Sequence, residues 1–153
     1  MAVGWPVHLA LGEVGVRPAV RSDAARLDAL RAKNQAWLST WDATVPPGAP
    51  LPIRSQSTMI AFQRRKAREG LMMPFVTTWS NEVVGQLTVN SITRGSAMSA
   101  SIGYWVSESH AGRGVTTTAV ALVSDHLLTT ARLHRVEIAI RPENAASLRV
   151  VEK

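Results

Sequence analysis

The sequence predicts a single α+β domain in which an antiparallel meander of strands is followed by one βαβ unit. β-rich runs between residues 75 and 106 are separated by short turns. Segments with apolar residues at helical spacing lie before and after these runs. The turn Gly112-Arg113-Gly114 leads into one such segment, and a short β run, His134 to Arg141, follows it. This order is typical of a right-handed crossover between two parallel strands.

The N-terminal part predicts a hairpin and a helix. Two apolar runs, Val7 to Leu11 and Val14 to Val20, are joined by Gly12-Glu13, which is a hairpin pattern. Ser22 offers an N-cap for the helix that follows, and its apolar stripe extends at least to Leu38.

The middle of the chain predicts a loop, a basic helix and the meander. Four prolines lie in Val45 to Pro52, which therefore must be a loop. A helix is expected from about Ser55 to Arg68. The three strands of the meander are expected at Phe75 to Trp79, Val83 to Val89 and Ser96 to Val106.

The C-terminal part predicts the βαβ unit and a last helix. After the glycine turn, apolar residues from Val115 to Leu127 form one helical stripe. Pro142 stops the final β run, and Ala145 to Lys153 begins a helix that has no C-terminal glycine signal. We therefore expect the natural chain to continue, so that residues 1–153 are a C-terminally incomplete domain.

Composition excludes several classes of protein. With 153 residues, 46% hydrophobic and 18% charged, the chain has an ordinary globular composition. It holds no Cys, which excludes a disulfide scaffold, a Cys-ligated zinc site and a thiol nucleophile. The four His have no metal-site spacing, so no metal is expected. No apolar stretch is long enough for a membrane span, and a cytoplasmic location is expected.

The net charge of +6 favours an anionic ligand or an acidic partner. The densest basic group is Arg64-Arg65-Lys66 with Arg68, and we expect it to lie on a solvent-exposed helix face. No aromatic residues interleave with it, and no nucleic-acid motif accompanies it. A nucleic-acid module is therefore the lowest-ranked interpretation, and direct nucleic-acid binding is not expected.

The glycine turn is the strongest functional signal. Glycines at a strand-to-helix junction let the backbone approach a ligand, and the free N–H groups of the first helical turn favour an anion. The hydroxyls of Thr116, Thr117 and Thr118 can add hydrogen bonds to that anion. A phosphate fits this pattern, although a tight turn that only feeds a helix is the alternative. The pattern is not a P-loop, because no Gly-Lys-Ser/Thr is present.

Three segments together resemble the GNAT family of N-acetyltransferases, and the resemblance covers essentially the whole chain. They are Ile102-Gly103-Tyr104-Trp105-Val106, the turn Ala111-Gly112-Arg113-Gly114-Val115, and Asn144 with Ser147. They are most similar to the RimJ/RimL-type branch, which acetylates the N-terminal amines of ribosomal proteins. The resemblance implies a GNAT-like mixed sheet, here without the last strand pair. An uncovered sheet edge invites self-association.

The resemblance implies acetyl-CoA as the co-substrate. The pantetheine arm would contact the backbone of Tyr104, Trp105 and Val106, and Asn144 would hold the ligand from the far side. The pyrophosphate would lie on Gly112, Arg113, Gly114, Val115, Thr116 and Thr117. Ala111 and Thr116 depart from the family's usual loop residues. Because the anion contacts are mainly backbone N–H groups, we expect weaker or rearranged binding rather than none.

Two residues are the candidates for proton transfer. Ser147 matches the serine that the RimJ/RimL branch places near the sulfur, where a hydroxyl can donate to a leaving thiolate; the alternative is a helix-surface hydroxyl. Glu137 is the candidate base, and its alternative is an ordinary exposed carboxylate. A base beyond residue 153 is a further alternative. The Glu and Tyr of alanine-specific relatives are replaced here by Ala139 and Val151.

The resemblance also implies an acceptor groove beside the first two helices, with Trp41 and Asp42 as acceptor contacts. The expected reaction is acetylation of the N-terminal amine of a protein, a ribosomal protein with N-terminal alanine. A small amine, either a polyamine or an aminoglycoside, is an alternative acceptor. The alternative to an enzyme is a binding module, which would hold CoA without catalysing acetyl transfer.

Overall fold

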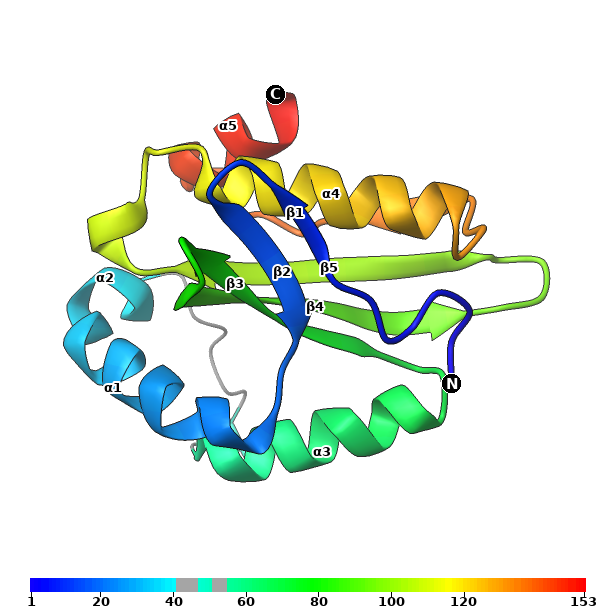
Figure 1. Cartoon of the computed structure of the whole chain (residues 1–153), viewed down its shortest axis with the longest axis horizontal. Helices are drawn as coiled ribbons and strands as arrows, with labels where there is room; N and C mark the ends of the chain where they lie inside the picture. The colour runs from blue at the N-terminus through cyan, green and yellow to red at the C-terminus, as the bar shows by residue number, and fades with distance from the viewer. Residues whose placement is uncertain (41–46, 51–54) are drawn as a thin grey trace.

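The computed structural model describes residues 1–40, 47–50 and 55–153, and it confirms the predicted α+β architecture (Figure 1). Within these residues, six strands form one sheet in the order β1 to β6. Neighbours are antiparallel except β5 and β6, which are parallel as a βαβ unit requires. The strands are β1 (Leu9–Leu11), β2 (Val14–Pro18), β3 (Met73–Trp79), β4 (Glu82–Thr93), β5 (Ser99–Val106) and β6 (Arg135–Glu137).

Helices cover both faces of the sheet (Figure 1). They are α1 (Ala24–Lys33), α2 (Gln35–Ser39), α3 (Gln56–Arg68), α4 (Val115–Thr129) and α5 (Ala145–Glu152). Alternating side chains of β3 supply both cores, because successive residues of a strand point to opposite faces. Phe75 is buried in the cluster beneath α4, and Val76 is buried in the cluster beneath α1 and α3.

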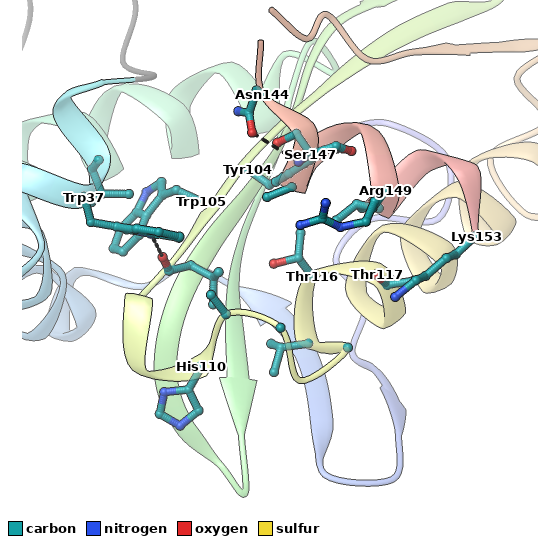
Figure 2. Close-up of a pocket in the computed structure, with 18 residues that line it drawn as sticks. Trp37, Tyr104, Trp105, His110, Thr116, Thr117, Asn144, Ser147, Arg149 and Lys153 are labelled. Carbon is teal, nitrogen blue, oxygen red and sulfur yellow. Dashed lines mark hydrogen bonds between the residues drawn. The ribbon is translucent and has the colours of Figure 1, made fainter. Parts of the chain in front are cut away.

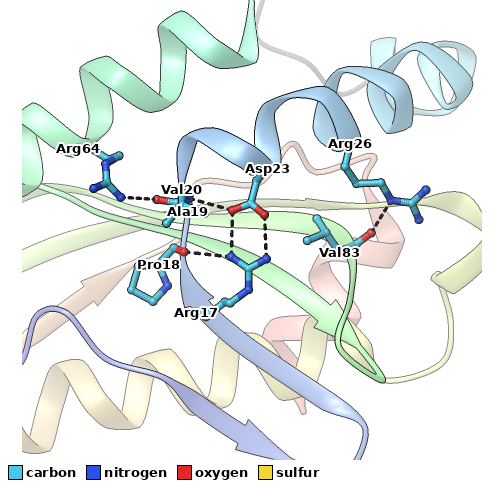
Figure 3. Close-up of polar contacts among 8 residues, drawn as sticks. All are labelled: Arg17, Pro18, Ala19, Val20, Asp23, Arg26, Arg64 and Val83. Carbon is cyan, nitrogen blue, oxygen red and sulfur yellow. Dashed lines mark hydrogen bonds and ion pairs between the residues drawn. The ribbon is translucent and has the colours of Figure 1, made fainter.

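The hairpin of β1 and β2 is confirmed, whereas the predicted N-cap at Ser22 is wrong. Ser22 lies inside a 3-10 turn that precedes α1. The carboxylate of Asp23 accepts the backbone N–H of Val20 at 2.8 Å and both terminal nitrogens of Arg17 at 2.8 and 2.9 Å (Figure 3). The helix therefore starts from an ion pair with β2, which a local pattern cannot show.

The predicted first helix is two helices, because the backbone of Asn34 departs from helical geometry at ψ 17° and ends α1. The second predicted helix is confirmed as α3, and the Ser55 hydroxyl accepts the Thr58 N–H at its start. Half of the predicted loop, Val45 to Pro52, lies outside the described residues, and its described part, residues 47–50, is neither helix nor strand.

The meander is confirmed, but its last strand, β5, and the strand of the βαβ unit, β6, are shorter than predicted. β5 begins at Ser99 because Met98 has φ +43°, which is incompatible with an extended strand. β6 ends at Glu137, and its residues pair with Ser99 to Ser101 of β5 only. Beyond that point the two strands separate, and the space between them is where the candidate site lies. No helix of the described residues is long and apolar enough to cross a membrane.

Candidate active site

A cavity of about 200 Å³ opens between the end of β5, the start of α4 and helix α5 (Figure 2). Most of the residues predicted for the site line it. They are Tyr104, Trp105, Val106, Gly112, Gly114, Val115, Thr116, Thr117, Asn144 and Ser147. Segments that lie up to 43 residues apart in the chain therefore meet at one place.

The glycine turn has the backbone that an anion site needs. Gly112 and Gly114 have φ +73° and +78°, in the left-handed region that glycine adopts without strain. Gly114 is the N-cap of α4, and its carbonyl accepts the first helical hydrogen bond, from Thr118 at 2.9 Å. None of the hydrogen bonds in the described part of the chain uses the N–H of Val115, Thr116 or Thr117. These donors and the helix dipole favour a negatively charged ligand.

The end of β5 presents peptide groups to the same cavity. The Ser107 N–H donates to the Val84 carbonyl at 2.8 Å, which fixes the phase of the antiparallel ladder between β4 and β5. Because bonded and non-bonded pairs alternate, Trp105 bonds to β4, whereas the N–H and C=O of Tyr104 and Val106 point away from it. The Val106 carbonyl accepts the indole N–H of Trp37 at 3.3 Å. The N–H groups of these two residues are therefore the open donors of the strand.

The side chain of Trp105 lies on the opposite face of the sheet from α4 and α5. Its indole N–H donates to the Gln86 side chain at 2.9 Å, and the Arg31 guanidinium lies 5.2 Å from its ring centroid. It packs against the core beneath α1 and α3. Trp105 thus holds the end of β5 in place beneath the cavity.

Helix α5 begins at the cavity wall. The Asn144 side-chain oxygen accepts the Ser147 N–H at 3.1 Å and caps the helix (Figure 2). The Tyr104 hydroxyl donates to the Ser147 carbonyl at 3.4 Å. Burial raises the pKa of Tyr104, so its phenol stays protonated at neutral pH. The Ser147 hydroxyl itself enters none of the hydrogen bonds of the described residues.

Four predicted site residues lie elsewhere or cannot be placed. Glu137 is exposed, its carboxylate pairs with Arg135 at 2.7 Å, and it does not line the cavity. Arg113 is exposed on the glycine turn and does not line the cavity either. Trp41 and Asp42 lie outside the described residues.

The structure adds residues that the sequence did not assign to the site. Trp37 and His110 line the cavity, together with Arg149 and Lys153 of the α5 segment. Arg149 and Lys153 are four residues apart, so both project from one helix face toward the start of α4 (Figure 2). Their positive charges suit a phosphate-bearing ligand. Their spacing was visible in the sequence, but their proximity to the glycine turn was not.

His110, which the sequence did not assign to the site, stands at the cavity rim. Its Nδ1 lies 2.9 Å from the Ser109 hydroxyl. Burial lowers the pKa of His110, and the Arg113 charge lowers it further, so the imidazole is neutral at neutral pH. His126, by contrast, is buried away from the cavity, and its Nε2 lies 2.8 Å from the Gly4 carbonyl oxygen.

Asn34 ties the helical layer to the turn before the cavity. Its side chain donates to the Ser107 hydroxyl at 3.1 Å and accepts the Glu108 N–H at 2.9 Å. Both Asn34 and Ser107 are buried, so these bonds are shielded from water. The break between α1 and α2 thus serves to hold the chain between β5 and the glycine turn.

Comparison with known proteins agrees with this geometry. The acetyltransferase (GNAT) domain family matches residues 13–153. The chain belongs to the GNAT acetyltransferase family. A solved structure of Mycobacterium smegmatis RimJ in complex with CoA-disulfide is similar at a TM-score of 0.90 and 37% identity, over 99% of this chain and 76% of that one.

Two further GNAT relatives act on ribosomal proteins according to their names. The ribosomal-protein-serine acetyltransferase of Escherichia coli (strain K12) is 28% identical over 121 residues, which are 77% of this chain and 64% of that protein. A Salmonella typhimurium acetyltransferase that modifies the N-terminal serine of 50S subunit protein L7/L12 has a TM-score of 0.78 and 25% identity, over 92% and 78% of the two chains. The chain spans less than two thirds of the length of the curated relatives it matches.

Proposed function

We propose that this chain transfers the acetyl group of acetyl-CoA to the N-terminal amine of a protein, a ribosomal protein with alanine at its N-terminus. The observation that supports this most is that two groups of open donors, at the end of β5 and at the start of α4, border the same cavity. The peptide groups at the end of β5 and the unbonded N–H groups at the start of α4 line one cavity. An extended amide-containing arm that ends in a pyrophosphate is complementary to that arrangement.

The hydrogen-bond donors that border the cavity determine the role that we assign to each residue in acetyl transfer. The amine attacks the thioester carbon, a C–N bond forms, and the C–S bond breaks to release the CoA thiolate. The Tyr104 and Val106 N–H groups are placed to stabilise the negative charge on the carbonyl oxygen. The Ser147 hydroxyl donates its proton, or a hydrogen bond, to the thiolate.

The amine must lose a proton before or during attack. We propose Glu137 as the base for this step. In the structure its carboxylate forms an exposed ion pair with Arg135. Because the carboxylate does not line the cavity, its action requires a water-mediated path. Glu137→Gln tests this role through the pH dependence of kcat, which should lose its acidic limb if the carboxylate is the base.

The relatives support a ribosomal-protein N-terminus as the acceptor, whereas the choice of alanine is left to the acceptor panel. Two of them are named for ribosomal-protein acetylation, and one is described as modifying an N-terminal serine. The test is a thiol-release assay with acetyl-CoA and peptides that have Ala, Ser or Met at a free N-terminus. N-terminally blocked peptides, a polyamine and an aminoglycoside serve as the competing acceptors.

Isothermal titration with acetyl-CoA accompanies the acceptor panel. Binding together with thiol release on free N-termini supports the proposal, and a preference for Ala over Ser supports the alanine assignment. Release with the polyamine or the aminoglycoside alone would assign a small-molecule acceptor. Binding without release on any acceptor would assign a CoA-binding module.

A further inference from the structure

The cavity is bounded by two elements that no strand pairing joins. β6 leaves β5 after Ser101, so the end of β5 and helix α5 stand on opposite sides of a gap (Figure 2). In the part of the chain that the structure describes, one side-chain hydrogen bond crosses this gap. It runs from the Tyr104 hydroxyl to the Ser147 carbonyl oxygen, at 3.4 Å.

Ser147 is held at both of its peptide groups. Asn144 accepts its N–H at 3.1 Å, and Tyr104 donates to its carbonyl. These two contacts fix the direction of the Ser147 Cα–Cβ bond, because the backbone on each side of it is anchored. The hydroxyl takes no part in this clamp, so it remains available to a ligand in the cavity.

We propose that Tyr104 is a positioning residue for acetyl transfer, which sets the separation between the open N–H groups of β5 and the Ser147 hydroxyl. This inference rests on the proposed function. Tyr104 contributes to both groups whose separation matters. Its backbone N–H is one of the open donors of β5, and its side-chain hydroxyl reaches across the gap to the Ser147 carbonyl of α5. A change in the Tyr104 contact therefore moves the proton donor relative to the carbonyl binding site.

The burial of Tyr104 supports a specific role for its hydroxyl. Its ring packs against the core beneath α4, and the side chain is partly buried. Burial keeps the pKa of Tyr104 raised, so the hydroxyl remains a donor through the neutral pH range. Tyr104→Phe keeps the ring and removes only this donor, which makes it the appropriate substitution.

The decisive experiment is a double-mutant cycle on the full chain. Tyr104→Phe should lower kcat by about three- to ten-fold, the effect of losing one modest hydrogen bond, while the KM for acetyl-CoA changes by less than about two-fold. In a Ser147→Ala background the same substitution should change kcat by less than about two-fold. Ser101→Ala is the matched control, because it removes a hydroxyl-to-carbonyl bond of β5 to Asn90, away from α5.

The cycle separates the competing roles of the phenol. An equal loss of kcat in both backgrounds would mean that Tyr104 acts on the substrate directly, and would overturn the proposal. No loss in either background would overturn it too. A loss expressed entirely in KM would assign Tyr104 to acetyl-CoA binding instead of positioning, which is a third contradicting result.

A structural measurement makes the test independent of turnover. The chain contains one Tyr, so 3-fluorotyrosine gives a single assigned ¹⁹F resonance. Asn144→Ala frees the other end of the clamp and should shift this resonance, whereas Ser101→Ala should not. An unchanged resonance in Asn144→Ala would overturn the clamp. Absence of acetyl-CoA binding by the wild-type chain, with the Asn144→Ala shift intact, would instead overturn the proposed function, and the positioning role with it.

Discussion

Replacing Gly114 with Asp tests whether the start of α4 binds a pyrophosphate. Gly114 is the N-cap of α4 at φ +78°, and a Cβ built there meets no described atom within 4 Å. The Cβ of the new side chain therefore does not clash with neighbouring atoms. Its left-handed backbone costs about 1 kcal/mol of stability for an L-residue. Asn tolerates this backbone as well as Asp does, so Gly114→Asn is the isosteric control without charge.

The magnitude follows from Coulomb's law. A carboxylate about 5–7 Å from one phosphate charge raises its energy by about 2–3 kcal/mol at an effective dielectric constant near 20. This corresponds to an acetyl-CoA affinity about 30- to 160-fold lower in Gly114→Asp than in Gly114→Asn at low ionic strength. Salt screens the repulsion, so the ratio should shrink in about 0.5 M salt.

Isothermal titration of acetyl-CoA into both variants, at low and high salt, measures this ratio. Thermal unfolding of the two variants confirms that they are folded to the same extent. Equal dissociation constants for the Asp and Asn variants at low salt would refute the assignment of the glycine turn as the pyrophosphate site. A difference that does not depend on salt would point to a steric cause instead.

Three further predictions concern the reaction and the fold. Ser147→Ala should lower kcat by about ten- to a thousand-fold, the range for losing one proton donor, and leave acetyl-CoA affinity nearly unchanged; steady-state kinetics with titration decides it. Asn34→Ala leaves the Glu108 N–H without its buried acceptor and should lower the free energy of unfolding by about 1–3 kcal/mol, measured by urea denaturation. Burial opposes ionisation of Asp23, but the Arg17 guanidinium and the Val20 N–H hold its pKa below the ordinary value. Its contribution to stability should therefore be complete above about pH 5 and be lost as the pH falls through the folded-state pKa; Asp23→Asn should abolish that dependence, and an unchanged acid profile would contradict it.

Local patterns were sufficient for the central strands and for the turn at the start of α4. The β-rich residues around Phe75 and Val76 predicted the central strands, and they are buried on both faces because helices cover each face of the sheet. The glycines at 112 and 114 predicted the turn, since both adopt the left-handed backbone. Except for Arg113, the residues predicted around that turn meet in the cavity, because the strand-helix junction that carries them is local in sequence.

Features that depend on distant partners could not be predicted. The helix start at Asp23 depends on Arg17 of β2, and the helix break at Asn34 depends on bonds to Ser107 and Glu108. Residues at helical spacing continue from Leu30 through Asn34 to Leu38, so periodicity alone favours one long helix. The length of β6 depends on where β5 turns away from it, which places Glu137 outside the cavity.

The central claim is that this chain acetylates free protein N-termini, and tandem mass spectrometry of an acetylated peptide tests it most directly. The peptide has a free N-terminal Ala and one internal Lys, and it is incubated with acetyl-CoA and the wild-type chain or Ser147→Ala. The account predicts an acetyl group on the N-terminal residue only, formed much faster by the wild-type chain. Acetylation of the Lys side chain alone, or no acetylated peptide at any enzyme concentration, would contradict it.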